Sequence, residues 1–286
     1  ENRTFSTSTD LPLSGIKIAI DPGHMAGDFE TGKVEQKYLE FRANDTTGLK
    51  EQIRLVEGMM TWQTAMIVKN ALEKKGAIVF VTRKEINNTS FGISYEDWLT
   101  TRRKTVLDSL FSIKKITAAE HKVFKTCKKE KLFWDFFRDY DLANRMKIMN
   151  VFQPDLSIVI HYNVDEKNVD WLKPGNKDYS MCFIGGAITG DNFNKVQHKL
   201  NFLRLLLTDD FSLSEKISGL TVKEFSERLK VPVAEKKDAT YLEENCNATS
   251  TKGVYCRNLA LCRGIQSPLV YGECLYQDNR EECMAL

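Results

Sequence analysis

A short apolar run near the start of the chain constrains both its fold and its chemistry. Residues 16–21, IKIAID, alternate apolar and polar or small side chains, and the run stops at Pro22-Gly23. Alternation with a period of two predicts a β-strand, and a Pro-Gly pair predicts a tight turn at its end. His24 follows that turn directly. An imidazole in this position is either an ordinary surface residue or a metal ligand held at the end of a sheet.

Strand-like and helix-like segments alternate along the rest of the chain. Residues 58–76 have the apolar periodicity of a helix and end at a glycine. Further runs are typical of buried strands, and they cover residues 77–83, 155–161, 179–187 and 267–273. This alternation predicts an α/β fold, with a mostly parallel, twisted sheet and helices on both faces.

Two polar blocks interrupt the alternation. Residues 86–140 are charged and helix-prone, with apolar positions such as Leu107 and Phe137. We expect them to form a helical insertion, packed as a hairpin, between the second and third strands. A second helix-rich stretch covers residues 191–245. The opening 14 residues are polar and are expected to be a leader, with residues 15–286 forming a single domain.

Composition excludes few functions. Of the 286 residues, 42% are hydrophobic, which is enough for a large core. The net charge of +2 does not favour a nucleic-acid-binding protein. No apolar run reaches the roughly 20 residues that a membrane-spanning helix needs. The seven cysteines contain no CxxC pair, so a thiolate zinc cluster is not indicated, and disulfides or buried thiols are equally compatible.

Four candidate residues fall at one edge of the predicted sheet. His24 follows the first strand, His161 ends the third, Glu273 ends the last, and Glu57 opens the first helix. In open α/β sheets, ligands bind at the carboxyl ends of the strands. Two imidazoles and one carboxylate with an open fourth position form a catalytic zinc site. The pattern therefore predicts a Zn²⁺ centre and an acid/base glutamate, although a glutamate in a first helical turn is also favoured by the helix dipole alone.

The blocks around these residues resemble, in the same order, the motifs of the zinc-dependent N-acetylmuramoyl-L-alanine amidases with an Amidase_3 domain. The matching blocks are IAIDPGH, the helix opened by Glu57, GAIVFVTR, LANRMKIMNVFQPDLSIVIHYN and SPLVYGECLYQDN. The resemblance covers the chain from about residue 15 to its end. It implies that His24, Glu57 and His161 hold zinc and that Glu273 is catalytic. It also implies substrate-binding or framework roles for Arg83, Arg145, Asn163 and Asn279.

The sequence departs from the family pattern in three places. His24 and Glu57 are 33 positions apart, more than is usual in the family, so Glu35 is an alternative metal ligand. The serine of the family's Ser-Ile-His motif is replaced, because Val159 and Ile160 precede the histidine. Leu275 stands where the family has a glycine, two residues after Glu273.

The resemblance implies hydrolysis of the amide between the lactyl group of N-acetylmuramic acid and L-alanine in peptidoglycan. It also implies a role in cell-wall remodelling or daughter-cell separation, and a periplasmic or cell-surface location after removal of a signal peptide. The helical insertion is expected to be structural or to dock a partner such as an activator protein, and a regulatory lid over the zinc is the alternative. The alternatives are a zinc hydrolase of another amide or peptide on the same scaffold, and a non-catalytic cell-wall binding module.

Overall fold

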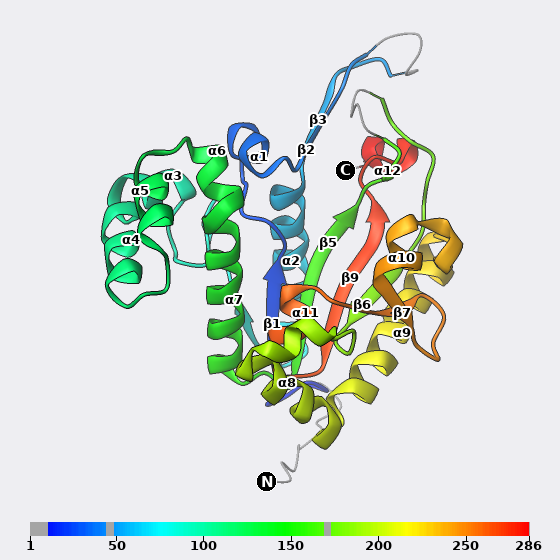
Figure 1. Ribbon diagram of the computed structural model, residues 1–286. Coiled ribbons are helices and arrows are strands. Elements are labelled where there is room, and N and C mark those ends of the chain that lie inside the picture. The colour runs from blue at the N-terminus through cyan, green and yellow to red at the C-terminus, as the bar shows by residue number, and fades with distance from the viewer. Residues whose placement is uncertain (1–10, 44–48, 169–172, 286) are drawn as a thin grey trace.

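One mixed sheet forms the centre of the molecule (Figure 1). The structure, a computed structural model, describes residues 11–43, 49–168 and 173–285. Within these residues seven strands pair in the order β4-β1-β5-β9-β6-β8-β7. Their bounds are β1 (Lys17–Pro22), β4 (Ile78–Val81), β5 (Leu156–Asn163), β6 (Met181–Ile184), β7 (Cys246–Ala248), β8 (Val254–Arg257) and β9 (Leu269–Tyr276).

The sheet is mostly parallel, as the sequence predicts. The pairs β1–β4, β1–β5, β5–β9 and β6–β8 are parallel, whereas β6 is antiparallel to β9 and β7 to β8. The short strands β7 and β8 were not predicted. The carboxyl ends of the adjacent strands β1, β5 and β9 therefore meet at one edge, which Figure 1 shows at the tips of the β5 and β9 arrows.

Helices cover both faces of the sheet, which confirms the predicted layering. The helices α2 (Glu57–Glu73) and α9 (Asp210–Leu229) lie on one face, where they pack on side chains such as Ile20 and Val270. The opposite face packs against α7 (Arg138–Phe152), α10 (Thr240–Asn245) and α11 (Ala260–Gly264), through side chains such as Ala19 and Val159. Strand residues alternate between these two cores, as the pleat requires.

A small hairpin accounts for the long interval between the first strand and the first long helix. The helix α1 (Phe29–Glu35) is followed by β2 (Tyr38–Phe41), which pairs antiparallel with β3 (Ile53–Val56). This hairpin was not predicted from the sequence. It extends away from the sheet in Figure 1 and returns the chain to the sheet edge at the first residue of α2.

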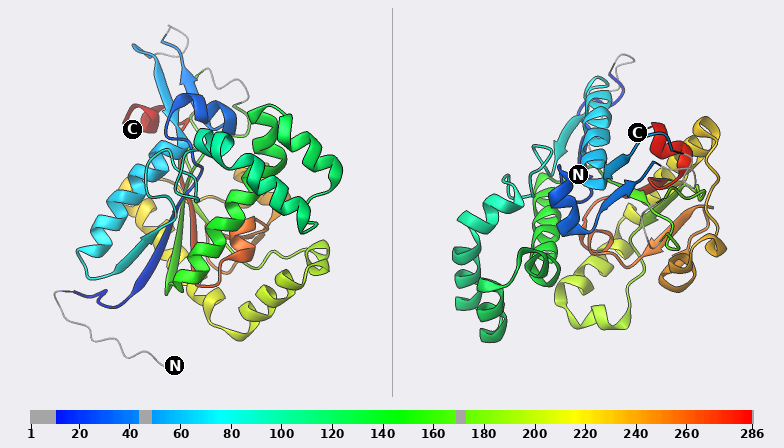
Figure 2. Two further views of the ribbon diagram at one scale, coloured as in Figure 1. Left: turned by 90° about the vertical axis from the view of Figure 1, so that its left-hand side faces the viewer. Right: turned by 90° about the horizontal axis from the view of Figure 1, so that it is seen from above.

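The predicted helical insertion is present, and it is larger than a hairpin. It contains α3 (Tyr95–Thr101), α4 (Arg103–Ser112), α5 (Ala118–Thr126) and α6 (Lys129–Leu132), and a π-helical turn, Phe133–Phe137, leads directly into α7. Figure 2 shows this block on one side of the sheet. It has an aromatic core of its own, which includes Trp98, Leu107 and Phe137 and also takes in Met25 and Val34 from the loop and helix after β1.

The remaining described elements lie beyond β6. They are a 3-10 turn (Gly190–Asn194), α8 (Val196–Leu207), a second 3-10 turn (Lys236–Asp238) and α12 (Arg280–Ala285). Cysteines 127, 246, 256 and 262 are free thiols. A helix long and apolar enough to cross a membrane does not occur among the described residues. Residues 1–10 of the expected leader lie outside them.

The core of the insertion also contains Met25 and Val34 from the rest of the domain. Truncating a leucine in this core should therefore destabilise the whole protein. Leu107 is fully buried, so Leu107→Ala should lower the free energy of unfolding by about 2–5 kcal/mol. The matched control is Leu207→Ala on α8, where the leucine is 83% exposed and the change should stay within about 0.5 kcal/mol. Urea unfolding followed by fluorescence measures both. Equal, small effects would mean that the insertion is only loosely docked.

Candidate metal centre

Two histidines and a glutamate converge at the edge where β1, β5 and β9 end. The potential ligand atoms of His24, Glu57 and His161 all lie within 4.8 Å of one another. His24 Nε2 is 3.2 Å from Glu57 Oε1, and His161 Nδ1 is 3.1 Å from the same oxygen. The three residues come from the loop after β1, the start of α2 and the end of β5. The structure thus brings together the three residues that the sequence predicts as zinc ligands.

The backbone of the loop that carries His24 has a left-handed conformation. His24 has φ of 60°, a region that side chains other than glycine adopt infrequently. The buried Arg145 holds this conformation, since its Nη2 donates to the His24 carbonyl at 2.6 Å and its Nη1 to the Pro22 carbonyl at 2.8 Å. Its charge is balanced by Asp141 and Asp21, with N–O distances of 2.7 and 3.2 Å.

A second buried arginine fixes the same loop from the other side. Arg83 follows β4, and its Nη1 donates to the carbonyls of Met25 and Ile86. Its Nη2 donates to the carbonyls of Gly23 and Gly58, the latter at 2.8 Å. Burial and the neighbouring Arg145 lower the pKa of Arg83 to about 9, which leaves the guanidinium charged at neutral pH. Arg83 and Arg145 are therefore framework residues.

Glu35 points at the loop and is not one of the three converging groups. Its carboxylate accepts hydrogen bonds from the backbone amides of Met25 and Ala26, at 3.1 and 2.8 Å. Glu35 Oε1 also lies 3.7 Å from His24 Nδ1, on the side of the imidazole opposite to the atom that faces Glu57. A carboxylate behind a ligating histidine orients the ring and fixes its tautomer. This geometry supports Glu57, and not Glu35, as the third ligand.

Glu57 is held by groups that sequence reasoning did not single out. Gln277 Nε2 donates to Glu57 Oε2 at 3.0 Å, and the Tyr162 amide donates to Oε1 at 3.2 Å. Lys37 Nζ is 3.8 Å from Oε2. Burial alone would raise the pKa of Glu57, but the charges of His24 and Lys37 lower it well below its usual value. The only sequence signal for Gln277 is its position in the final block, between Glu273 and Asn279.

Glu273 lies beside the histidine on the neighbouring strand. In the parallel β5–β9 pair, Glu273 is opposite His161, so the two side chains leave the same face of the sheet. Two residues earlier, the ring of Tyr271 stacks on His161 with centroids 4.9 Å apart. Burial and the nearby Glu57 raise the pKa of Glu273 to about 8.

The two asparagines have structural contacts. Asn163 Nδ2 donates to the hydroxyl of Tyr241 at 2.6 Å, and its Oδ1 accepts from the Val164 amide. Asn279 Oδ1 accepts from the amides of Glu281 and Glu282 at the start of α12, and its Nδ2 donates to the Lys177 carbonyl. These bonds hold the segments that follow β5 and β9. They favour a framework role over substrate binding for both asparagines.

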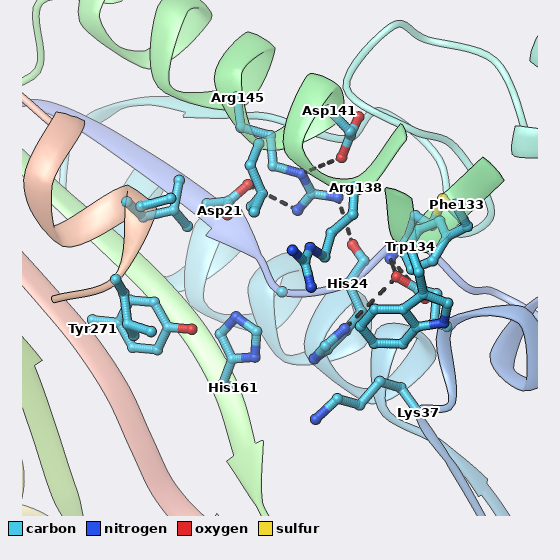
Figure 3. Close-up of a pocket in the computed structure, with 17 residues that line it drawn as sticks. Asp21, His24, Lys37, Phe133, Trp134, Arg138, Asp141, Arg145, His161 and Tyr271 are labelled. Carbon is cyan, nitrogen blue, oxygen red and sulfur yellow. Dashed lines mark hydrogen bonds and ion pairs between the residues drawn. The ribbon is translucent and has the colours of Figure 1, made fainter. Parts of the chain in front are cut away.

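The donor set suits a zinc ion. Two neutral imidazoles and a carboxylate are the ligands of many catalytic zinc sites, and the held orientation of each ligand supports that use. Burial alone would lower the pKa of His24, but Glu57 and Glu35 outweigh it and raise that pKa to about 9. Glu57 therefore attracts a positive charge between the histidines. A cavity of about 280 Å³ opens over His24 and His161, and Figure 3 shows Tyr271, Trp134, Arg138 and Lys37 around it.

A comparison with known protein families identifies the family of this chain. Residues 18–286 match the Amidase_3 family, described as N-acetylmuramoyl-L-alanine amidase. The chain belongs to the N-acetylmuramoyl-L-alanine amidase family. The match covers nearly the whole chain and includes every residue of the candidate centre, and the family is one of peptidoglycan-cleaving enzymes.

The chain also matches solved structures of amidases at low sequence identity. The CwlD amidase from Clostridioides difficile, in complex with the GerS lipoprotein, is 13% identical with a TM-score of 0.47, and the match covers 94% of this chain and 87% of that one. The apo form of Ami1 from Mycobacterium abscessus is 15% identical with a TM-score of 0.43, and the match covers 95% and 89% of the two chains. No curated protein sequence matches the chain.

Gly23 should be essential to the metal centre, because the His161 ring leaves no room for a side chain at this position. A Cβ atom at Gly23 would lie 2.3 Å from the His161 ring, so Gly23→Ala must displace this imidazole. We expect the variant to lose at least half of its bound zinc on dialysis against a weak chelator, as measured by elemental analysis. Gly190→Ala is the control, because a Cβ there meets nothing within 4 Å. Retention of zinc by Gly23→Ala would show that zinc binding does not require the His161 ring to keep its present position.

Zinc uptake should release a proton near neutral pH. With the pKa of His24 at about 9, the imidazole of the chelator-treated protein is protonated at pH 7, and a metal must displace that proton. Apparent zinc affinity should therefore rise with pH up to about 9. Calorimetry in two buffers of different ionisation enthalpy would measure the release. An affinity that does not change between pH 6 and 9 would contradict the protonated state of His24.

Proposed function

We propose that the protein is a zinc-dependent amidase that cleaves the bond between N-acetylmuramic acid and L-alanine of the peptidoglycan stem peptide. His24, Glu57 and His161 hold the metal, and Glu273 handles the protons. The observation that carries the proposal is the register of β5 and β9, which sets Glu273 beside His161 on the same face of the sheet. Family membership supports the same reading.

The residues of the chain divide the reaction between them. Zn²⁺ bound to the three ligands would polarise the scissile carbonyl and lower the pKa of a water molecule. Glu273 takes the proton of that attacking water and later donates it to the leaving amine of L-alanine. A pKa of about 8 suits both steps, because a general acid–base group works best when its pKa is near the operating pH.

Two competing functions make different demands on the site. A hydrolase of another amide would use the same centre, and a panel of amide and peptide substrates would discriminate it. A non-catalytic cell-wall binding module has no need for a partly buried glutamate next to the histidines. Burial and the nearby Glu57 raise the pKa of Glu273, which makes its carboxylate a better proton acceptor. This favours an enzyme over a binding module.

We further propose a role in cell-wall remodelling or daughter-cell separation, at the cell surface or in the periplasm. Peptidoglycan lies there, and the family acts on peptidoglycan. An activator protein that docks on the helical insertion fits this role. The surface-exposed helices α4 and α5 are the part of the insertion that such a partner would reach.

The first test is a digest of purified peptidoglycan read by mass spectrometry. We expect release of intact stem peptides that begin with L-alanine, its loss with a zinc chelator and its recovery on adding zinc. Cleavage within the peptide, or of a different amide in the substrate panel, would favour the alternative hydrolase. Stoichiometric zinc binding without any cleavage of peptidoglycan would favour the binding module.

Replacing Glu273 separates binding from catalysis. Glu273→Gln should retain stoichiometric zinc and substrate binding but lose activity by about 10²- to 10⁴-fold, the usual contribution of a positioned acid–base group. Glu281→Gln is the control, because that glutamate is exposed on α12 in the same part of the chain. Wild-type turnover by Glu273→Gln would exclude it as the acid–base residue.

A further inference from the structure

The end of the helical insertion forms one wall of the candidate active site. Phe133, Trp134 and Arg138 line the same cavity as His24 and His161. They belong to the π-helical turn Phe133–Phe137 and to the first residue of α7. A π-helical turn widens the helix by one residue per turn and occurs frequently at functional sites. In Figure 3 the side chain of Arg138 points into the cavity, between Trp134 and His161.

Two cationic side chains, Arg138 and Lys37, lie partly exposed on the lining of the cavity. Asp21 and Asp141 pair with Arg145, deep in the wall. Glu35 is occupied by the backbone amides of Met25 and Ala26. Each of these acids thus has a partner within the protein. Lys37 is 39% exposed and lies 3.8 Å from Glu57, whereas Arg138 is 44% exposed and uses only its Nε in an ion pair, with Asp139 outside the cavity lining.

Arg138 is held in place by its Nε and by the indole, and its terminal amino groups stay available. Its Nε donates to Asp139 Oδ1 at 2.9 Å. Its guanidinium carbon lies 5.3 Å from the centre of the Trp134 ring, within the range of a cation–π contact. No hydrogen bond from Nη1 or Nη2 to another described residue occurs. The two outer N–H groups of a guanidinium match the two oxygens of a carboxylate.

We propose that Arg138, supported by Trp134, binds a carboxylate of the stem peptide and makes this enzyme selective for acidic over amidated stems. The inference rests on the proposed amidase function and names the substrate class of that site. A carboxylate bound here lies on the peptide side of the scissile amide and takes no part in bond breaking. The contact is made equally in the ground state and the transition state, so it acts on KM and leaves kcat nearly unchanged. Arg138 is a specificity residue and not a catalytic one.

The test compares two substrate preparations that differ only in whether their carboxylates are charged. Soluble muropeptides are used as released from the glycan, or after their carboxylates have been converted to carboxamides with carbodiimide and ammonium. Arg138→Gln should lower kcat/KM for the acidic muropeptides by about tenfold or more, mainly through KM. It should leave the amidated muropeptides within about twofold of the wild type. Arg138→Lys keeps the charge but not the paired donors. Its kcat/KM for the acidic muropeptides should lie between those of the wild type and of Arg138→Gln.

The matched control is Arg102→Gln, which removes the same charge from an exposed position of the same insertion, away from the cavity. It should not change the preference of the enzyme, and thermal melts check that each variant is folded. An equal loss by Arg138→Gln on both substrates, or a wild type that does not distinguish them, would overturn the specificity role. Failure of the wild type to cut either preparation would instead refute the amidase proposal, and the inference with it.

Discussion

The site depends on two buried guanidiniums that bind the carbonyls of one loop. The chain leaves the sheet at the end of β1, and from Pro22 to Met25 its carbonyls are bound by side chains. A buried carbonyl without a partner costs free energy comparable to a lost hydrogen bond. Arg145 and Arg83 supply the donors. A lysine could not replace either one, because its single ammonium cannot reach several carbonyls arranged around a plane.

These bonds also allow an unfavourable backbone at the histidine. A residue other than glycine in the left-handed region costs on the order of 1–3 kcal/mol when it is held there by its surroundings. Here the His24 carbonyl is bound by Arg145, and the amides of Met25 and Ala26 are bound by Glu35. Together with Arg83, which binds the Gly23 and Met25 carbonyls, these two side chains determine the direction of one imidazole. The metal centre is preorganised by the fold before any ion binds.

The sequence predicted the parts of the site that follow from strand ends and not those that follow from tertiary packing. His24 follows β1, and His161 and Glu273 lie near the carboxyl ends of β5 and β9. These strands have clear apolar patterning, and parallel strands bring their carboxyl ends to one edge. Glu35 was open to two interpretations, because spacing along the chain does not show that α1 turns its carboxylate toward backbone amides. Gln277 has no local signal, since its role depends on the distant Glu57. The β2–β3 hairpin was not predicted, because its strands are only four residues long and are separated by a polar segment.

The insertion is connected to the metal centre through Met25, the residue after His24. The Met25 side chain is 2% exposed and packs in the aromatic core of the insertion, while its amide binds Glu35 and its carbonyl binds Arg83. A removable lid would leave the ligand loop unchanged when it opened. This insertion shares a core residue with the loop, so loosening its packing would disturb the backbone that positions His24. A protein that binds the outer helices would therefore have a physical path to the metal centre, through the packing of one methionine.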